Sequence, residues 1–525
     1  MASSSLVAID SLSLAQQVAQ MVVVRASGHL FDVQIEYPAW EPPQATLREW
    51  IGAWGVGGVI LLGGTAAEVW MRSRQLQSWS EIPLFVAADV EEGVGQRFAG
   101  ATWFPPPMAI AEIARRDLSA ARRYAWEMGE ITARQAQALG INWILAPVVD
   151  VNNNPQNPVI NVRAFGDTPE VVGELTQAFI RGSQQHSVLN AAKHFPGHGD
   201  TSVDSHLHLP TIPHSQQRWQ QVERVPFARA IAAGVDAVMS AHLRMPAFDD
   251  RLPATLSPAI LTGQLRQQMG FSGLIVTDAL VMGAIANAYT PATAAVMAVE
   301  AGADILLMPS DPKATIEAVV EAVEAGRISR ERIRASVARI WQAKSKIASS
   351  CWQHGGDPIP DLPATFHPSA QSLLVASSSQ WGNGQLPPAG EQQTPCNVIV
   401  VDELLREEAL KGHPPAIAVP WEKGYQLRLC DRFTPSVAYW ELKGPVLVQL
   451  FARGHPFRGV AGMAPEVDVW LRQLLDRRQL QALVIYGSPY LRDRWFEILP
   501  EETVGLFSFG QMQAAQACLM EKIFA

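Results

Sequence analysis

The sequence predicts a (β/α)8 barrel of the TIM type, followed by a smaller α/β layered domain. Eight apolar runs rich in β-branched residues alternate with helical patterns, many of these runs end in polar clusters, and a break rich in Gly, Pro, Ser and Gln follows residue 348. With 525 residues, the chain is also too long for one ordinary core. The expected domains are a barrel over 1–348, a linker with a short helix over 349–395, and a sandwich-like α/β domain over 396–525.

The predicted barrel strands are eight short runs. In chain order they are VAQMVVVRA, VGGVILLGG, PLFVAADVE, INWILAPVVDV, NAAKHFPGHG, DAVMSAHLRMP, GLIVTDALVM and ADILLMPSD. Intervening segments such as DLSAARRYAWEMGEITARQAQALG repeat apolar residues every three to four positions, as amphipathic helices do. An open doubly wound sheet would show the same alternation with fewer units. Because no GxGxxG motif opens a helix after the first run, the closed barrel is favoured.

The last part of the chain repeats a shorter alternation. Strand-like runs are NVIVVDELL, PAIAVPW, GPVLVQLFARG, ALVIYGSP and TVGLFSFG, and the helical patterns are VDVWLRQLLDRRQLQ, YLRDRWFEIL and QAAQACLMEKIF. This pattern predicts a layered α/β domain. Its role, whether packing support, oligomerisation or substrate selection, is left open by the sequence.

Composition excludes several classes of partner. Hydrophobic residues make up 48% of the chain, and 41 basic against 50 acidic side chains give a net charge of −9. A net negative charge disfavours nucleic acid and anionic membrane surfaces, and no apolar window is long enough to span a bilayer. The four cysteines show no metal-ligand or CxxC spacing, and the N-terminus lacks a secretory pattern. The expected location is therefore the cytoplasm.

Polar side chains follow five of the predicted strands. They are Asp89, Glu91 and Glu92 after the third, Asp150 after the fourth, Lys193 and His194 in the fifth, His242 and Arg244 in the sixth, and Asp278 in the seventh. In a barrel the carboxyl ends of all strands open onto one face, where active sites are built. The sequence therefore predicts that these residues converge on a site at that face.

The segment KHFPGHGDTSVDSHLHLP, residues 193–210, is the richest in titratable groups and allows three interpretations. It could be an inert polar loop. It could bind a metal through histidines 194, 198, 206 and 208, as in metal-dependent barrel hydrolases, although the spacing fits neither HxxxH nor an HxH on the first strand. Alternatively, Asp204 and His206 lie two apart in an extended loop and form a proton-transfer dyad, in which the carboxylate orients and charges the imidazole.

Asp278 is a candidate for the second catalytic group that such a dyad needs. It follows one apolar run and precedes another, so it is expected either to emerge into the barrel mouth or to cap a helix. An ionised Asp opposite a protonated His suits double displacement at an acetal carbon. A polyhydroxylated substrate would then need charged hydrogen-bonding partners, and Asp89, Arg163, Lys193 and His194 are candidates for this role.

These motifs resemble family 3 glycoside hydrolases of the β-N-acetylglucosaminidase (β-hexosaminidase) type. The resemblance covers most of residues 15–345 and includes KHFPGHGDTSVDSHLHLP, NPVINVRAFG, ADVEEGVGQRF and SAHLRMPAFDD. It implies release of terminal N-acetylglucosamine from β-linked glycosides such as cell-wall fragments, without a metal or an organic cofactor. It also implies roles for seven residues: Asp278 as nucleophile, His206 as acid/base, Asp204 as its orienting partner, and Asp89, Arg163, Lys193 and His194 as contacts to sugar hydroxyls.

One loop departs from the family pattern. The family usually has Asp-x-Glu-Gly-Gly, whereas this chain has Asp89-Val-Glu91-Glu92-Gly93. Several functions remain open. A histidine acid/base repels an anionic acceptor less than Glu would, so phosphate could replace water and make the protein a phosphorylase. The residues are also compatible with a β-glucosidase of the same family, a metal-dependent hydrolase and a non-catalytic sugar-binding protein, and the oligomeric state and natural aglycone are unassigned.

Overall fold

The computed structural model describes residues 6–351, 367–382, 386, 394–434, 442, 444–453 and 465–524. Much of the predicted linker, 349–395, therefore lies outside the described residues. Within the described part, no helix is both long and apolar enough to cross a membrane.

The first domain is the predicted barrel. Its strands are β1 Val22–Ser27, β2 Gly58–Leu62, β3 Phe85–Ala88, β4 Trp143–Ile144, β5 Leu189–Phe195, β6 Ala237–Ser240, β7 Leu274–Val276 and β8 Leu306–Leu307. All neighbours pair in parallel in the order β7-β6-β5-β4-β3-β2-β1-β8, and a bridge between Val276 and Ile305 joins the two ends. Each strand matches one of the eight predicted runs to within one residue, so the fold-class prediction is confirmed.

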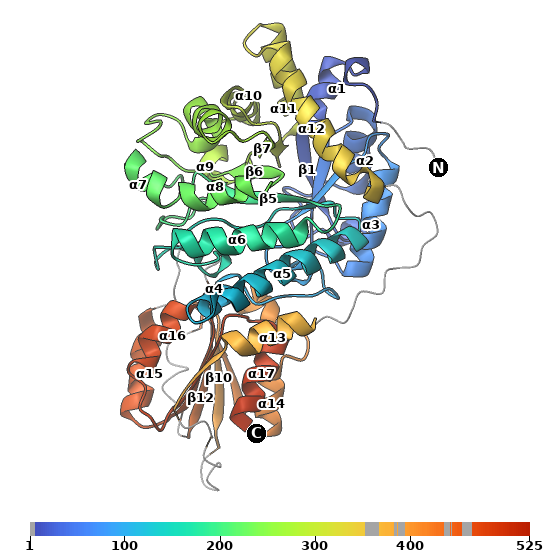
Figure 1. Ribbon diagram of the computed structural model, residues 1–525. Helices are drawn as coiled ribbons and strands as arrows, with labels where there is room; N and C mark the ends of the chain where they lie inside the picture. Colours follow the sequence, from blue (N-terminus) through green and yellow to red (C-terminus); the bar gives the residue numbers. More distant parts are fainter. Residues whose placement is uncertain are drawn as a thin grey trace.

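Helices cover the outside of the barrel (Figure 1). They are α1 Leu14–Ala19, α2 Gln44–Glu49, α3 Ala66–Ser78, α4 Met108–Ala114, α5 Leu118–Ala138, α6 Pro169–Ser183, α7 Gln216–Gln221, α8 Arg224–Ala232, α9 Gly283–Ala286, α10 Pro291–Ala301, α11 Pro312–Glu324 and α12 Arg330–Cys351. Local signals set several starts: Thr65 and Glu68 form a capping box before α3, and Asp311 caps α11 with Pro312 at its first position. The strands are almost entirely buried, so the core fills the barrel itself.

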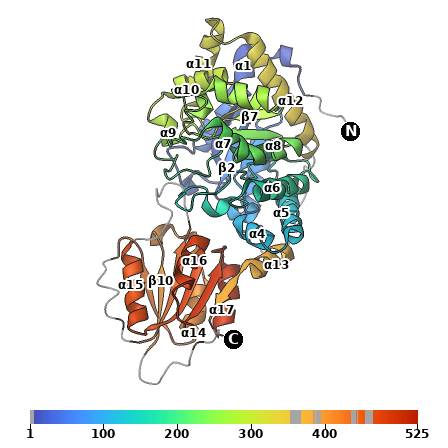
Figure 2. The same ribbon diagram turned by 60° about the vertical axis from the view of Figure 1, so that its left-hand side comes forward.

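The second domain is a six-stranded sheet between helices. Its strands are β9 Ser379–Trp381, β10 Cys396–Val400, β11 Gln426–Cys430, β12 Val446–Ala452, β13 Leu480–Gly487 and β14 Val504–Ser508, in the order β11-β10-β12-β13-β14-β9. All pairs are parallel except β14 with β9. The helices are α13 Pro368–Ser377, α14 Pro415–Glu422, α15 Pro465–Asp476, α16 Pro489–Phe496 and α17 Gln513–Phe524. In Figure 2, α15 and α14 flank opposite sides of the sheet, which confirms the layered architecture.

The strand predicted at PAIAVPW is wrong, because these residues form α14. Pro415 occupies the first helical position, where its fixed φ suits a helix and its missing N–H costs nothing. Ala416 and Pro420, four residues apart, form its buried face. Two observed strands have no counterpart among the predicted runs: β11 is short and only partly buried, and β9 lies inside the stretch expected as linker.

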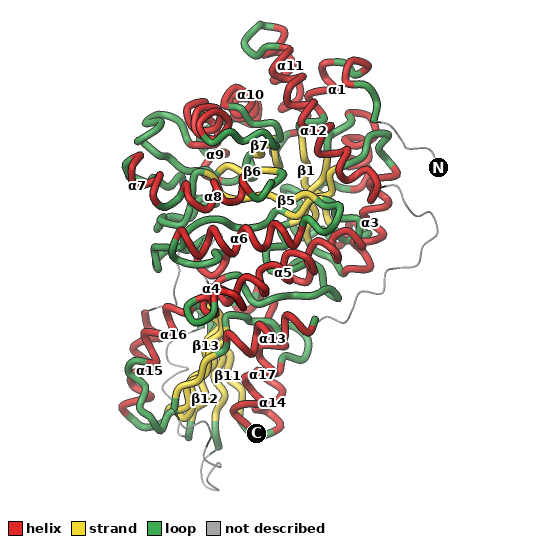
Figure 3. The backbone as a smooth tube through the Cα atoms, viewed as in Figure 1, coloured by secondary structure: helices red, strands yellow, loops and turns green. Residues whose placement is uncertain are grey.

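The two domains touch where functional loops lie. Figure 3 shows α13 between the barrel helices and the second sheet, and α13 contacts α4, α5 and α17. Arg453, directly after β12, reaches Glu92 of the barrel, and Tyr490, shortly after β13, reaches Asn152. The carboxyl ends of these strands therefore face the carboxyl face of the barrel.

Candidate active site

Two of the four predicted sugar contacts, Lys193 and Arg163, meet at the carboxylate of Glu91, and Lys193 also pairs with Asp89. Lys193, buried on β5, places Nζ 2.8 Å from Asp89 Oδ1 and 2.6 Å from Glu91 Oε1. Arg163 donates to both Glu91 oxygens, with Nε and Nη2 each 2.8 Å away. Glu91, in the loop after β3, thus bridges Lys193 and Arg163. The sequence marks Glu91 only as a polar strand end and not as a site residue, because its role depends on two cations that are distant in the chain.

The opposite charges of this cluster favour the ionised form of each member. Burial acts to raise the pKa of Glu91, but Arg163 and Lys193 outweigh it and hold that pKa well below its usual range. Burial likewise opposes the charge on Lys193, yet Asp89 and Glu91 raise its pKa. Asp89, whose side chain is 33% exposed, also has a lowered pKa because Lys193 and Arg97 outweigh burial. The cluster is therefore fully ionised near neutral pH and can offer charged hydrogen bonds to a polyhydroxylated ligand.

His194, the fourth predicted contact, is oriented by Asp150 in the segment that follows β4. Asp150 Oδ2 lies 2.7 Å from His194 Nδ1 and accepts the His194 backbone N–H at 3.2 Å. Asp150 is fully buried, and the charge of His194 lowers its pKa despite that burial. A carboxylate against Nδ1 fixes a proton on that atom and directs Nε2 away from Asp150. The same Asp150 accepts the His198 backbone N–H at 2.6 Å, so it connects two histidines of the segment.

His198 anchors the loop that carries the predicted dyad. Its Nε2 lies 2.9 Å from Ser205 Oγ and its Nδ1 lies 3.0 Å from Thr201 Oγ1. Burial lowers the pKa of His198 to about 4, against an opposing effect of Asp150. A neutral imidazole held between two hydroxyls ties residues 201–205 to the rigid strand β5.

We expect His198 to make the protein less stable as the pH falls from 6.5 to 4. The pKa is about 4 in the folded chain against 6.5 for a free histidine, so the unfolded state takes up the proton first. The stability that a neutral His198 allows is therefore complete above pH 6.5 and falls by roughly 3 kcal/mol toward pH 4. The measurement is the free energy of unfolding in urea at pH 7.5 and at pH 5. Between these two pH values, this free energy should fall less in His198→Gln than in the parent. Exposed His208→Gln is the control, and equal losses in parent and His198→Gln would contradict the prediction.

Asp204 and His206 contact each other in a tight turn rather than in an extended loop. Asp204 Oδ1 lies 2.9 Å from His206 Nδ1 and accepts the His206 backbone N–H at 2.9 Å, while the Asp204 carbonyl accepts from Leu207 and His208. The predicted extended geometry is wrong because Asp side chains readily accept backbone N–H groups two residues on and so fold the chain into a turn. With Nδ1 facing Asp204, the proton that His206 can exchange with a substrate is the one on Nε2.

Asp278 follows β7 at the same face and does not cap a helix, since α9 begins at Gly283 with Met282 as its N-cap residue. Burial acts to raise the pKa of Asp278, but the charges of His242, His194 and His206 outweigh it and lower that pKa. The Gly283 N–H donates to the His206 carbonyl at 3.1 Å, so the dyad loop rests on the segment after Asp278. The carboxylate is thus ionised, and the charges of three histidines from different parts of the chain act on it.

His242 is a neighbour of Asp278 that the sequence marks only as a polar strand end. Its Nε2 lies 3.0 Å from the Ala279 carbonyl and its Nδ1 lies 2.8 Å from Thr255 Oγ1. Burial lowers the pKa of His242, although Asp278 opposes this. The hydrogen bond from His242 to the Ala279 carbonyl therefore fixes the backbone immediately after Asp278.

The histidines of residues 193–210 are not grouped as metal ligands. The ring nitrogens of His194, His198 and His206 have the protein partners given above, and in the described ranges no three His, Cys, Asp or Glu side chains form a group that could hold a metal ion. The arrangement expected for a metal-dependent hydrolase is therefore not formed by these residues.

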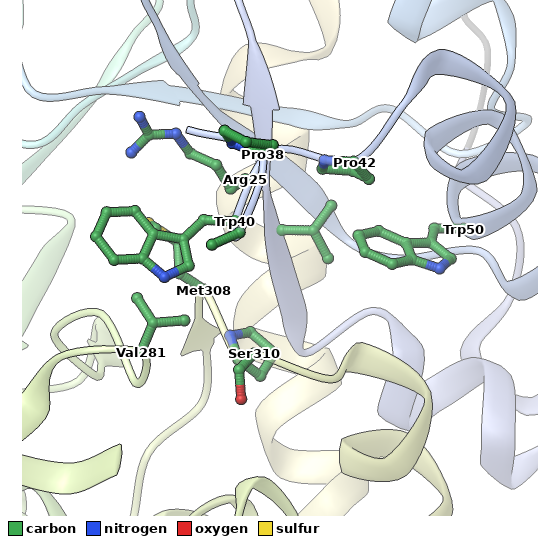
Figure 4. A pocket seen from close by; sticks show the side chains of 11 residues that line it. Arg25, Pro38, Trp40, Pro42, Trp50, Val281, Met308 and Ser310 are labelled. Atoms are coloured by element: carbon green, nitrogen blue, oxygen red, sulfur yellow. The ribbon is translucent and has the colours of Figure 1, made fainter. Parts of the chain in front are cut away.

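A cavity of about 160 Å³ lies between β1 and the residues that follow β8 (Figure 4). It is lined by Val24, Arg25, Pro38, Ala39, Trp40, Pro42, Trp50, Val281, Met308, Pro309 and Ser310. Glu41 holds Arg25 at 2.9 Å, and Val281 lies three residues after Asp278. No predicted sugar contact lines this cavity.

A closed parallel barrel that faces a layered second domain across a charged surface is typical of two-domain glycoside hydrolases. Residues 13–343 match the glycosyl hydrolase family 3 N terminal domain, and residues 389–525 match the bacterial glycosyl hydrolase family 3 C-terminal domain. The chain therefore belongs to glycosyl hydrolase family 3, as its motifs predict.

Relatives agree with this assignment. Beta-hexosaminidase A of Pseudoalteromonas piscicida is 36% identical over 340 residues, which are 59% of this chain and 56% of the relative. A beta-N-acetylglucosaminidase/beta-glucosidase of Cellulomonas fimi is 32% identical over 315 residues, 58% of this chain and 54% of the relative. The matches thus span little more than half of these two relatives. The solved structure of a family 3 beta-N-acetylglucosaminidase from Paenibacillus sp. str. FPU-7 is 30% identical with a TM-score of 0.79, covering 98% of this chain and 97% of that chain.

Proposed function

We propose that this protein is a retaining β-N-acetylglucosaminidase that releases terminal N-acetylglucosamine from β-linked glycosides such as cell-wall fragments. The observation that carries the proposal is an ionised Asp278 among three histidines at the barrel mouth, with the Asp204–His206 pair resting on the segment that follows it. The names of the hexosaminidase relatives and the similarity to the Paenibacillus structure along the whole chain support the same substrate class.

In the first step, Asp278 attacks the anomeric carbon while the bond from that carbon to the leaving oxygen breaks. The leaving oxygen takes the proton from His206 Nε2, so the alcohol departs neutral and His206 becomes neutral. Asp204 stabilises the protonated imidazole before this transfer and sets its orientation through Nδ1. The product is a glycosyl ester of Asp278.

In the second step, His206 acts as a base. It accepts a proton from water as the water oxygen attacks the anomeric carbon, and the bond to Asp278 breaks. Two inversions leave the β-configuration retained. Phosphate could take the place of water without a base, which would yield a sugar 1-phosphate.

The charged cluster positions the sugar for these steps. Asp89, Arg163, Lys193 and His194 are proposed to bind its hydroxyls, with Glu91 and Asp150 orienting them. Charged hydrogen bonds distant from the reacting carbon hold the ring in one place and so favour attack by Asp278.

The test compares two chromogenic substrates under identical conditions. We expect the β-N-acetylglucosaminide to be cleaved much faster than the matching β-glucoside, and NMR of early product to show the β-anomer. The comparison matters because the Cellulomonas fimi relative is named for both activities. Equal rates on both sugars would reject the assignment, and a sugar 1-phosphate formed in phosphate buffer would identify a phosphorylase instead.

Replacing Asp204 tests the acid/base role separately. We expect Asp204→Ala to reduce kcat by roughly 10²-fold for alkyl glycosides, but much less for aryl glycosides with acidic leaving groups, which need little protonation. The measurement is a plot of log kcat against leaving-group pKa, whose slope should steepen. Asp200→Ala, which removes a carboxylate paired with His214 at 2.9 Å, serves as the loop control. A uniform loss across all leaving groups would argue against the dyad.

A further inference from the structure

The second domain reaches the loop that carries Asp89 and Glu91. Glu92 has no exposed side-chain surface, although a glycine is usual at this place in the family motif. Its carboxylate accepts from both terminal nitrogens of Arg453, with Nη1 3.1 Å from Oε2, and from Trp103 Nε1 at 2.9 Å. Arg453 directly follows β12, so the cation that neutralises this buried barrel carboxylate comes from the other domain.

A second contact reaches the loop that carries Arg163. Asn152 Nδ2 donates to Tyr490 Oη at 2.6 Å, while Asn152 Oδ1 accepts the Asn161 backbone N–H at 2.9 Å. Asn161 begins the short 3-10 helix Asn161–Arg163, which places the Arg163 guanidinium on Glu91. Tyr490 therefore braces Asn152, and Asn152 braces the helix that aims Arg163.

Both contacts converge on the same charged cluster. Glu91 and Glu92 are consecutive, so a shift of Glu92 moves Glu91 and with it the partners of Lys193 and Arg163. Removing one partner of a buried ion pair leaves an uncompensated charge, which the loop can relieve only by moving toward water. The geometry of the sugar cluster thus depends on side chains that the barrel does not contain.

We propose that the second domain completes the sugar site by holding these two loops, with Arg453 and Tyr490 as positioning residues. Neither is assigned to touch the substrate. The expected change in KM rests on the proposed function. The ordering of the two loops by Arg453 and Tyr490 does not depend on that function. It assigns the second domain a role in sugar binding rather than only in packing.

The kinetic test uses the full-length chain and a chromogenic β-N-acetylglucosaminide. We expect Arg453→Ala to raise KM about tenfold with little change in kcat, and Arg453→Lys to restore part of the loss. Glu92→Gln combined with Arg453→Ala should be less impaired than the sum of the two single changes, because the double variant leaves no buried charge unpaired. Tyr490→Phe, which removes one hydroxyl, should raise KM severalfold and remains informative if Arg453→Ala does not fold.

The structural test needs no turnover. Hydrogen exchange should quicken in residues 89–97 of Arg453→Ala and in residues 157–166 of Tyr490→Phe. Arg494→Ala is the matched control, because Arg494 pairs with Asp468 inside the second domain, and its KM and exchange should equal those of the parent. If the parent fails to cleave the substrate, the proposed function fails while exchange still decides the loop role. The proposal is overturned if Arg453→Ala and Tyr490→Phe both have the KM and the hydrogen exchange of the parent. It is also overturned if these variants are only less stable to heat, with KM and hydrogen exchange unchanged.

Discussion

Asp278→Ala is expected to lower kcat on β-N-acetylglucosaminides by about 10⁴-fold or more, the largest loss of any single change. Without the carboxylate no covalent ester can form, and an uncharged methyl group cannot stabilise the positive charge that develops at the anomeric carbon. Steady-state rates with a nitrophenyl glycoside measure the loss. Added azide should restore part of the rate and yield the α-glycosyl azide, because a small anion can occupy the vacated space and attack once.

Two controls make this result specific. Asp250→Ala removes an exposed carboxylate from the loop after β6 and should leave kcat near that of the parent. Asp278→Ala should still bind N-acetylglucosamine, since the proposed contacts to the sugar hydroxyls come from the loop after β3, the 3-10 helix Asn161–Arg163 and β5. A substantial kcat in Asp278→Ala, or azide giving the β-product, would remove Asp278 from the nucleophile role.

Glu91→Ala should have the second largest effect of the changes described. It should lower both the free energy of unfolding and the affinity for the sugar. Lys193 and Arg163 would lose the carboxylate they share in a site where the Glu91 side chain is 4% exposed. Breaking a buried ion pair in this way typically costs about 3–5 kcal/mol. Urea unfolding at pH 7 measures this cost, and kcat/KM should fall because two proposed sugar contacts lose their orientation.

The loss of stability in Glu91→Ala should become smaller as the pH falls. The folded-state pKa lies well below the ordinary value of 4.5, so the stability from this carboxylate is complete above pH 4.5 and is lost as the pH falls through the folded-state pKa. The difference between parent and Glu91→Ala should therefore narrow in acid. Exposed Glu81→Ala provides the baseline, and a difference that stays constant down to pH 3 would contradict the assigned pairing.

Much of the barrel could be predicted from the sequence, because each strand is marked by residues that are neighbours in the chain. Each strand is a short apolar run bounded by turn residues, and parallel strands buried on both faces need no alternation to be recognised. Placing Asp89, Lys193 and Asp278 at one face required only the rule that strand ends in a barrel converge. Their common surroundings in the structure follow from that rule.

The remaining features depend on partners that are far apart in the chain. The bridging role of Glu91 requires Arg163 and Lys193 to arrive from two other loops, and the burial of Glu92 requires Arg453 from another domain. The strand prediction at PAIAVPW fails because a short apolar run fits a strand and a buried helix equally well. The Asp204 turn arises from a side chain that competes with extended backbone for hydrogen bonds.

The helix α13 gives the molecule a shared core. Leu373 packs into the cluster that contains the barrel interior, while its neighbour Leu374 packs with Met512 and Ala515 of the second domain. One short helix therefore contributes apolar contacts to both halves, so neither half can melt without exposing part of the other. Heating should accordingly produce one cooperative transition, and a barrel expressed without residues 367–382 should be prone to aggregate along α4 and α5.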